Sequence, residues 1–110
     1  MQIQINTDSN IEGTEALAAH VKDVVNNAIG RFSDHITRVE VHLGDENGGK
    51  TGPADKRCML EARMEGRQPT AVTHHAGSVH EAIDGAAVKL KHAIETTVEK
   101  REDARRHPGR

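Results

Sequence analysis

Residues 79–106 read VHEAIDGAAVKLKHAIETTVEKREDARR, and this stretch decides what kind of fold the chain needs. Its apolar residues recur at helical spacing over about five turns: Val79, Ile83, Ala86, Ala87, Leu90, Ile94 and Val98. Ser78 and Glu81 have the spacing of a capping box, so we expect the helix to begin there and to end at about Asp103 or Arg106. A helix with one apolar face requires a second layer to cover it.

A second apolar stripe predicts another helix nearer the N-terminus, beginning at about Thr14. Its members are Leu17, Val21, Val24, Val25, Ala28, Ile29 and Phe32. Gly30 and the Ser33-Asp34 pair mark where this helix weakens and stops. Both helices therefore need an apolar surface that the rest of the chain must supply.

Four segments alternate polar and apolar residues, which is typical of strands with one face in water. These segments are 2–7, 38–43, 58–65 and 70–76. Pro69 directly before the last segment suits an edge strand or the first position of a strand. The Gly, Asp and Pro content of residues 44–57 predicts a loop between the second and third segments.

The order of elements is β-α-β-β-β-α, and it predicts an α+β fold of two layers. We expect a four-stranded sheet in which the last three strands form an antiparallel meander and the first strand is added through a right-handed crossover. Both helices cover one face of this sheet. A chain of 110 residues has the size of one domain. We expect that domain to span residues 1–104, with a flexible tail over 105–110.

Composition limits the kinds of function that the chain can have. The formal net charge is −2 and the aromatic content is 1%, with Phe32 as the one such ring besides the histidines. This composition counts against a single-strand binder that stacks bases on aromatic platforms, while recognition of a nucleic-acid backbone through a local basic patch stays open. The lone Cys58 cannot form an internal disulfide, and the N-terminus lacks a secretory signal, so we expect a cytoplasmic protein without a membrane segment.

No residue pattern indicates catalysis, a metal or a cofactor. His74 and His75 are adjacent on a predicted strand and so point to opposite faces, which disfavours a shared metal ion. Cys58 falls at an inward strand position, where a packing role is expected. The NGGKTG stretch over 47–52 lacks the spacing of a phosphate-binding loop. The acidic residues of the 44–57 loop are expected to be solvated. We predict neither an enzyme nor a small-molecule substrate.

Basic residues on the wet side of the last helix are the strongest candidates for binding. They are Lys89, Lys91, His92, Lys100 and Arg101. Cations near a helix C-terminus also interact favourably with the helix dipole, and Lys91 and Glu95 have the spacing of an ordinary i,i+4 pair. Because nearby acidic residues dilute the positive field, these residues alone favour a solvated face over an RNA surface.

Several motifs, together with the order of elements, resemble the bacterial ribosome hibernation-promoting factor family. They are TEAL (14–17), RFSDHITRVEVHL (31–43), QP (68–69) and HEAIDGAAVKL (80–90). Some members of this family are known as ribosome-associated inhibitors or sigma modulation proteins. The resemblance covers nearly the whole chain, from residue 1 to about residue 103.

The resemblance implies a domain similar to double-stranded RNA-binding domains and a role in translation. Family members bind the small ribosomal subunit in the channel used by messenger and transfer RNA, so that translation stops and ribosomes are stored under stress or in stationary phase. Basic side chains contact ribosomal RNA phosphates, and no catalysis is implied. The candidate RNA-binding residues in this chain are Lys22, Arg31, Lys89, Lys91, His92, Lys100 and Arg101.

The chain also departs from the family pattern. Ala18, Asn26 and Asn27 stand where related sequences often have Arg or Lys, and Thr96 stands where a Lys is common. Because each lost phosphate contact weakens binding, two alternatives stay open. The fold could serve as a protein-interaction module that pairs with itself or with another protein through the open sheet face or an edge strand. Alternatively, binding could depend on acid, through protonation of histidines such as His92.

Overall fold

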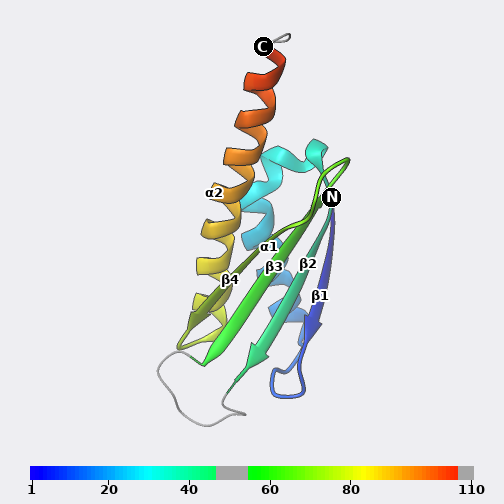
Figure 1. Ribbon diagram of the computed structural model, residues 1–110. Helices are drawn as coiled ribbons and strands as arrows, with labels where there is room; N and C mark the ends of the chain where they lie inside the picture. The colour runs from blue at the N-terminus through cyan, green and yellow to red at the C-terminus, as the bar shows by residue number, and fades with distance from the viewer. Residues whose placement is uncertain (47–54, 107–110) are drawn as a thin grey trace.

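The computed structural model describes residues 1–46 and 55–106, with side chains as far as residue 99. The predicted order of elements is confirmed, with one added 3₁₀ turn, η1 (Figure 1). The elements are β1 (Gln2–Thr7), α1 (Glu15–Ile29), η1 (Gly30–His35), β2 (Ile36–Asp45), β3 (Lys56–Met64), β4 (Thr70–Ala76) and α2 (Val79–Arg106). The helix α2 includes residues 105 and 106, and the flexible tail stays a prediction because residues 107–110 lie outside the described residues.

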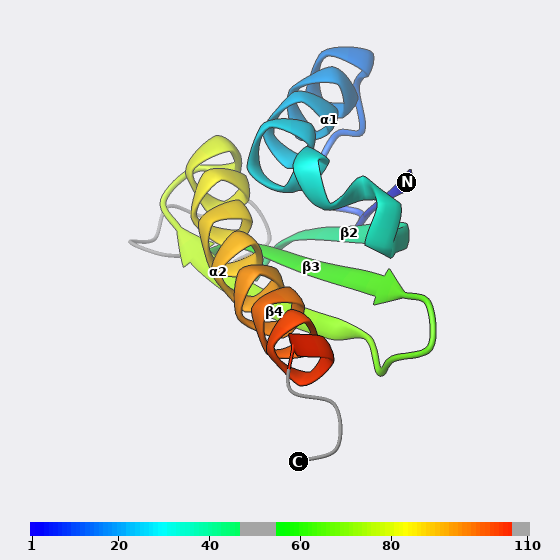
Figure 2. The same cartoon turned by 90° about the horizontal axis from the view of Figure 1, so that it is seen from above.

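The four strands form one sheet in the order β1-β2-β3-β4. The strand β1 pairs with β2 in parallel, with Ile3 beside Val39, and the other two pairings are antiparallel. Both helices lie on the same face of this sheet, with α2 over β3 and β4, as Figure 2 shows. The α+β fold of two layers is therefore confirmed, and the strands β1 and β4 are its edges.

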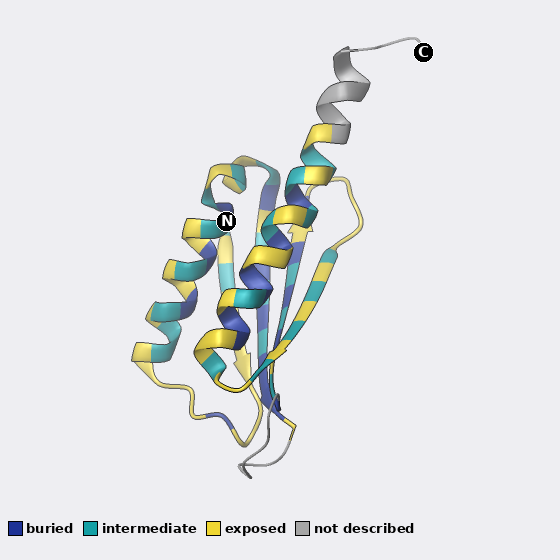
Figure 3. Cartoon of the chain, turned by 90° about the vertical axis from the view of Figure 1, so that its left-hand side faces the viewer, coloured by how far each residue is buried: buried dark blue, intermediate teal, exposed yellow. Residues whose placement is uncertain are grey.

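The core lies between the sheet and the two helices. In Figure 3 the buried turns of both helices face the central strands, while the outer strands alternate between half-buried and exposed residues. The fully or almost fully buried apolar side chains include Val21, Val25 and Ile29 of α1, Val39 and Val41 of β2, Cys58 and Leu60 of β3, and Ile83, Leu90 and Ile94 of α2. The two stripes and the strand alternation in the sequence meet in this one cluster.

Side-chain caps define where each helix begins. The hydroxyl oxygen of Thr14 accepts a hydrogen bond from the backbone N–H of Leu17 at 3.0 Å. The hydroxyl oxygen of Ser78 accepts one from the N–H of Glu81 at 3.1 Å. Each bond satisfies a backbone donor that the first turn of a helix leaves without a partner.

The loop between β2 and β3 is shorter than the sequence predicts. The strand β2 continues to Asp45 and β3 begins at Lys56, so the predicted loop 44–57 is too long at both ends. Asp45 and Asp55 are both 5% exposed, and the expectation of solvated carboxylates is wrong for this pair. The Nζ atom of Lys56 lies 3.5 Å from Asp45 and 3.1 Å from Asp55, which makes their burial tolerable. Residues 47–52 lie outside the described residues.

Candidate nucleic-acid interface

Among the described side chains, the predicted basic residues do not gather into one patch, and Lys89 shows why. Its exposed side chain bends toward the sheet edge, where Nζ donates a hydrogen bond of 2.8 Å to the backbone carbonyl of Thr73 in β4. One of its three donors is therefore already used within the domain.

Lys91 lies on another side of α2, facing α1. It lines an open groove of about 360 Å³ between the two helices. Aliphatic side chains of Val24, Ala28, Ala87 and Val88 form much of this groove. Val88 is 54% exposed and is the one large apolar side chain among the described residues that is exposed to this extent. We call this feature the interhelical groove.

Polar contacts between the helices flank this groove. Arg31 forms an ion pair with Glu95 of α2, and its guanidinium carbon lies 4.5 Å from the centre of the Phe32 ring. Further toward the start of α2, the Nε2 atom of His20 lies 3.6 Å from Asp84. The rings of His20 and His80 stack with their centres 4.2 Å apart. The positive charge of Arg31 is thus compensated by a carboxylate.

Of the other four candidates, two have described side chains and two do not. Lys22 is exposed on α1 and His92 is exposed on α2. Within the part of the chain whose side chains are described, Lys22 and Lys91 make no ion pair, and neither does His92. Lys100 and Arg101 belong to the later turns of α2, and their side chains lie outside that part.

The helix layer carries an excess of negative charge up to residue 99. Its acidic residues are Glu15, Asp23, Asp34, Glu81, Asp84, Glu95 and Glu99, against Lys22, Arg31, Lys89 and Lys91. The basic residues of α2 become dense only after this point, in Lys100, Arg101, Arg105 and Arg106. These four residues stand against Glu102 and Asp103, so residues 100–106 are the part of α2 whose sequence has an excess of positive charge.

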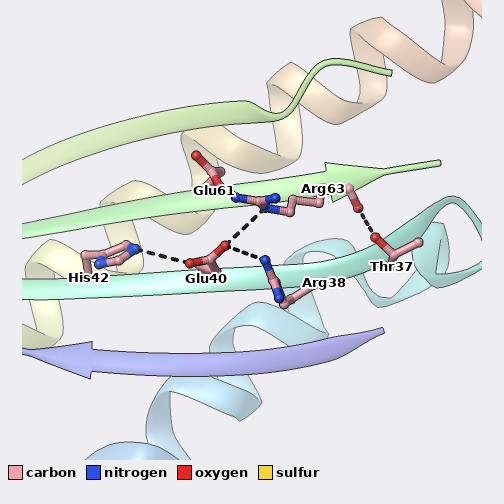
Figure 4. Close-up of polar contacts among 6 residues, drawn as sticks. All are labelled: Thr37, Arg38, Glu40, His42, Glu61 and Arg63. Carbon is pink, nitrogen blue, oxygen red and sulfur yellow. Dashed lines mark hydrogen bonds and ion pairs between the residues drawn. The ribbon is translucent and has the colours of Figure 1, made fainter. Parts of the chain in front are cut away.

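The open face of the sheet holds an ionic network that the sequence analysis did not single out (Figure 4). Glu40 of β2 lies at its centre, with an oxygen 3.0 Å from Arg38 and 3.1 Å from Arg63, and another 3.8 Å from His42. Arg63 also reaches Glu61 at 3.2 Å. The sequence does show arginines and glutamates at outward positions of two neighbouring strands. Which of them pair, however, depends on the register of β2 with β3.

A second cluster lies at the end of the same face, around Glu46. Its carboxylate lies 3.7 Å from Arg57 and 2.9 Å from His75. His74, the preceding residue, is half-buried on the opposite face of β4, against α2. The prediction that these two adjacent histidines point to opposite faces is confirmed.

Other chemistry finds little support in the geometry. Among residues 1–46 and 55–106, no three His, Cys, Asp or Glu side chains are placed to share a metal ion. No helix in those ranges is long and apolar enough to cross a membrane. Cys58 is fully buried, and this burial raises the pKa of its thiol to about 12.

The family model described as "Sigma 54 modulation protein / S30EA ribosomal protein" matches residues 3–102. The chain belongs to this family. The family is ribosome-associated and is not a family of enzymes. The sequence resemblance to hibernation-promoting factors is thereby confirmed over nearly the whole chain.

Solved structures of related proteins share the fold. The N-terminal domain of Protein Y from Thermus thermophilus superposes with a TM-score of 0.72 at 20% sequence identity, covering 88% of this chain and 99% of that one. A ribosomal subunit interface protein from Coxiella burnetii gives a TM-score of 0.74 at 14% identity, covering 90% of this chain and 99% of that one. No curated protein is significantly similar in sequence.

Proposed function

We propose that this protein is a ribosome-associated translation regulator of the cytoplasm that binds the small ribosomal subunit and inactivates and stores ribosomes under stress or in stationary phase. The observation that carries the proposal is membership of a ribosome-associated family over residues 3–102. Two structural neighbours with the same fold carry names that refer to a ribosomal subunit interface or to Protein Y.

The contacts in this proposal are between lysine and arginine side chains and ribosomal RNA phosphates. Such contacts need no aromatic platform, and that fits a chain whose aromatic content is 1%. Lys22 and Lys91 are the described candidates that make no ion pair, and Lys100 and Arg101 of the later turns of α2 stay in the proposal on sequence grounds. Lys89 and Arg31 are weaker candidates, because each is already bound to another group of the domain.

The test is co-sedimentation of the purified protein with small ribosomal subunits at increasing salt concentration. Binding through phosphates predicts that the logarithm of the affinity falls linearly with the logarithm of the salt concentration. Retention of the protein near physiological salt supports the proposal. Loss of the protein from the pellet even at low salt contradicts it.

A second candidate function is a protein-interaction module with the same fold. The observation that favours it is the excess of acidic residues on the helix layer up to residue 99. In this case the affinity for ribosomal subunits is low at every salt concentration, and a partner protein is retained by the immobilised chain. Charge reversal of Lys91 leaves that retention unchanged, which separates the two candidates.

A further inference from the structure

The two edges of the sheet are protected to different extents. On the β4 side, the ammonium group of Lys89 occupies the outward carbonyl of Thr73, and α2 packs along the strand. On the β1 side, within the described residues, no side chain or backbone group bonds the outer edge of residues 2–7. A strand at a sheet edge presents a row of N–H and C=O groups that can pair with another strand.

The sequence of β1 leaves this edge open to pairing. Its residues QIQINT contain no charged side chain and no proline, and their register with β2 has no bulge. Charges, prolines and bulges are the features by which proteins normally prevent strand addition. The strand β1 has none of them.

The helix layer also stops short of this edge. A hollow of about 260 Å³ lies between β1 and α1, lined by Ile5, Thr7, Gly13, Thr14, Leu17 and Ala18. Ile3 and Ile5 are only half-buried, whereas their neighbours Val39 and Val41 in β2 are fully buried. An added strand with alternating apolar residues would therefore cover the exposed rim of the core.

We propose that the occupant of this edge is β1 of a second copy of the chain, paired antiparallel across a twofold axis. Two copies of β1 are complementary in this arrangement. Their isoleucines lie opposite each other on the face covered by the helices, and their uncharged amide side chains lie opposite each other on the open face. Such pairing joins two four-stranded sheets into one. It closes as a dimer, because a twofold pairing uses the β1 edge of both copies, and the β4 edge at each end has the carbonyl of Thr73 already bonded to Lys89. This inference does not depend on ribosome binding.

The first experiment measures the association of the full chain by analytical ultracentrifugation over a wide range of protein concentration. The expected result is a monomer–dimer equilibrium. Gln4→Lys places two like charges close together across the axis and is expected to weaken the dimer by at least about tenfold. The matched control is Ala71→Lys, which adds the same charge to the exposed face of the opposite edge strand and leaves the dimer unchanged.

Gln4 is exposed, so at protein concentrations where both variants are monomeric, Gln4→Lys is expected to unfold at the same temperature as Ala71→Lys. Amide hydrogen exchange gives a second readout that does not depend on the variant. In the wild-type protein, protection of residues 2–7 rises with protein concentration, while that of residues 70–76 stays constant.

Three results would overturn the proposal. One is a chain that stays monomeric at every concentration, in which case the edge is left to a strand of another protein. Another is a dimer that Gln4→Lys does not weaken. The third is a dimer weakened by Ala71→Lys, which would place the contact on β4.

Discussion

Cys58 shows how a single buried position decides the chemistry of a side chain. Its thiol lies fully inside the core beneath the helices, and desolvation disfavours the thiolate, which raises the pKa to about 12. The thiolate is the reactive form of cysteine. The folded protein therefore holds its one cysteine in an unreactive state.

We predict that Cys58 is modified by a thiol reagent only after unfolding and that its burial makes folding sensitive to alkali. The pKa of the thiol is raised in the folded state from an ordinary value of 9.0 to about 12, so its contribution to stability is fully present below pH 9 and is lost as the pH rises toward 12. The measurements are the rate of modification with and without urea and the unfolding midpoint as a function of pH. Rapid modification of the native protein would contradict the prediction.

Lys56 provides a second prediction at the residue scale. The hydrogen bond to Asp55 is the main cause that raises the pKa of its ammonium group, and Asp45 adds to the effect. Lys56→Met removes the cation from two buried carboxylates, so the urea midpoint is expected to fall more than in Arg67→Met, a control at an exposed turn. Equal midpoints in the two variants would show that the carboxylates do not depend on Lys56.

At the scale of elements, the contact between α2 and β4 depends on Gly85. Glycine is unfavourable in the middle of a helix, yet it lies in the second turn of α2. A Cβ atom at this position would overlap the imidazole ring of His74. Gly85 therefore allows α2 to lie close to the edge strand, which is also where Lys89 reaches the backbone of β4.

A double-mutant cycle tests this reason for the glycine. In a His74→Ala background, Gly85→Ala is expected to stabilise the protein by about 1 kcal/mol, because alanine is the better helix former. In the wild-type background, this gain is expected to be lost, because the ring of His74 must move. Chemical denaturation of the four proteins gives the coupling energy. The same gain in both backgrounds would show that the two residues do not compete for space.

At the scale of the whole molecule, the distribution of charge governs how the protein meets RNA. The carboxylates of Glu40 and Glu46 engage arginines on the open sheet face, and Glu95 compensates Arg31 on the helix layer. Among the described lysines and arginines of the helix layer, only Lys22 and Lys91 make neither an ion pair nor a hydrogen bond. The formal net charge of −2 adds no long-range attraction to phosphates.

If the proposed ribosome binding is correct, then Lys22→Ala and Lys91→Ala are each expected to lower the salt slope of binding by roughly 1. Lys89→Ala is expected to have a smaller effect, because this side chain bonds the backbone of β4. Arg67→Ala, at the turn after β3, is the control and keeps the wild-type slope. Equal slopes in all four variants would remove Lys22 and Lys91 from the interface.

The candidate site was only partly predictable from the sequence. Helical spacing placed the basic residues of α2 on its wet side, but it could not show that Lys89 turns toward β4 while Lys91 faces α1. Nor could it pair Arg31 with Glu95, which are far apart in the chain. Such contacts depend on how two elements lie against each other, and local periodicity contains no information about that.

The sequence by itself determined the elements, their order and the two-layer fold, because apolar periods of two and of 3.6 residues leave one way for each element to bury its apolar side. Only the tertiary structure decided which charged side chains are buried and which of them form ion pairs. Burial of Asp45 and Asp55, the network around Glu40, the need for Gly85 and the unequal edges β1 and β4 all arise from side chains brought together across elements. The apolar side of an element is set by the spacing of its own residues, whereas a contact between two side chains depends on how far apart their elements lie in the folded protein.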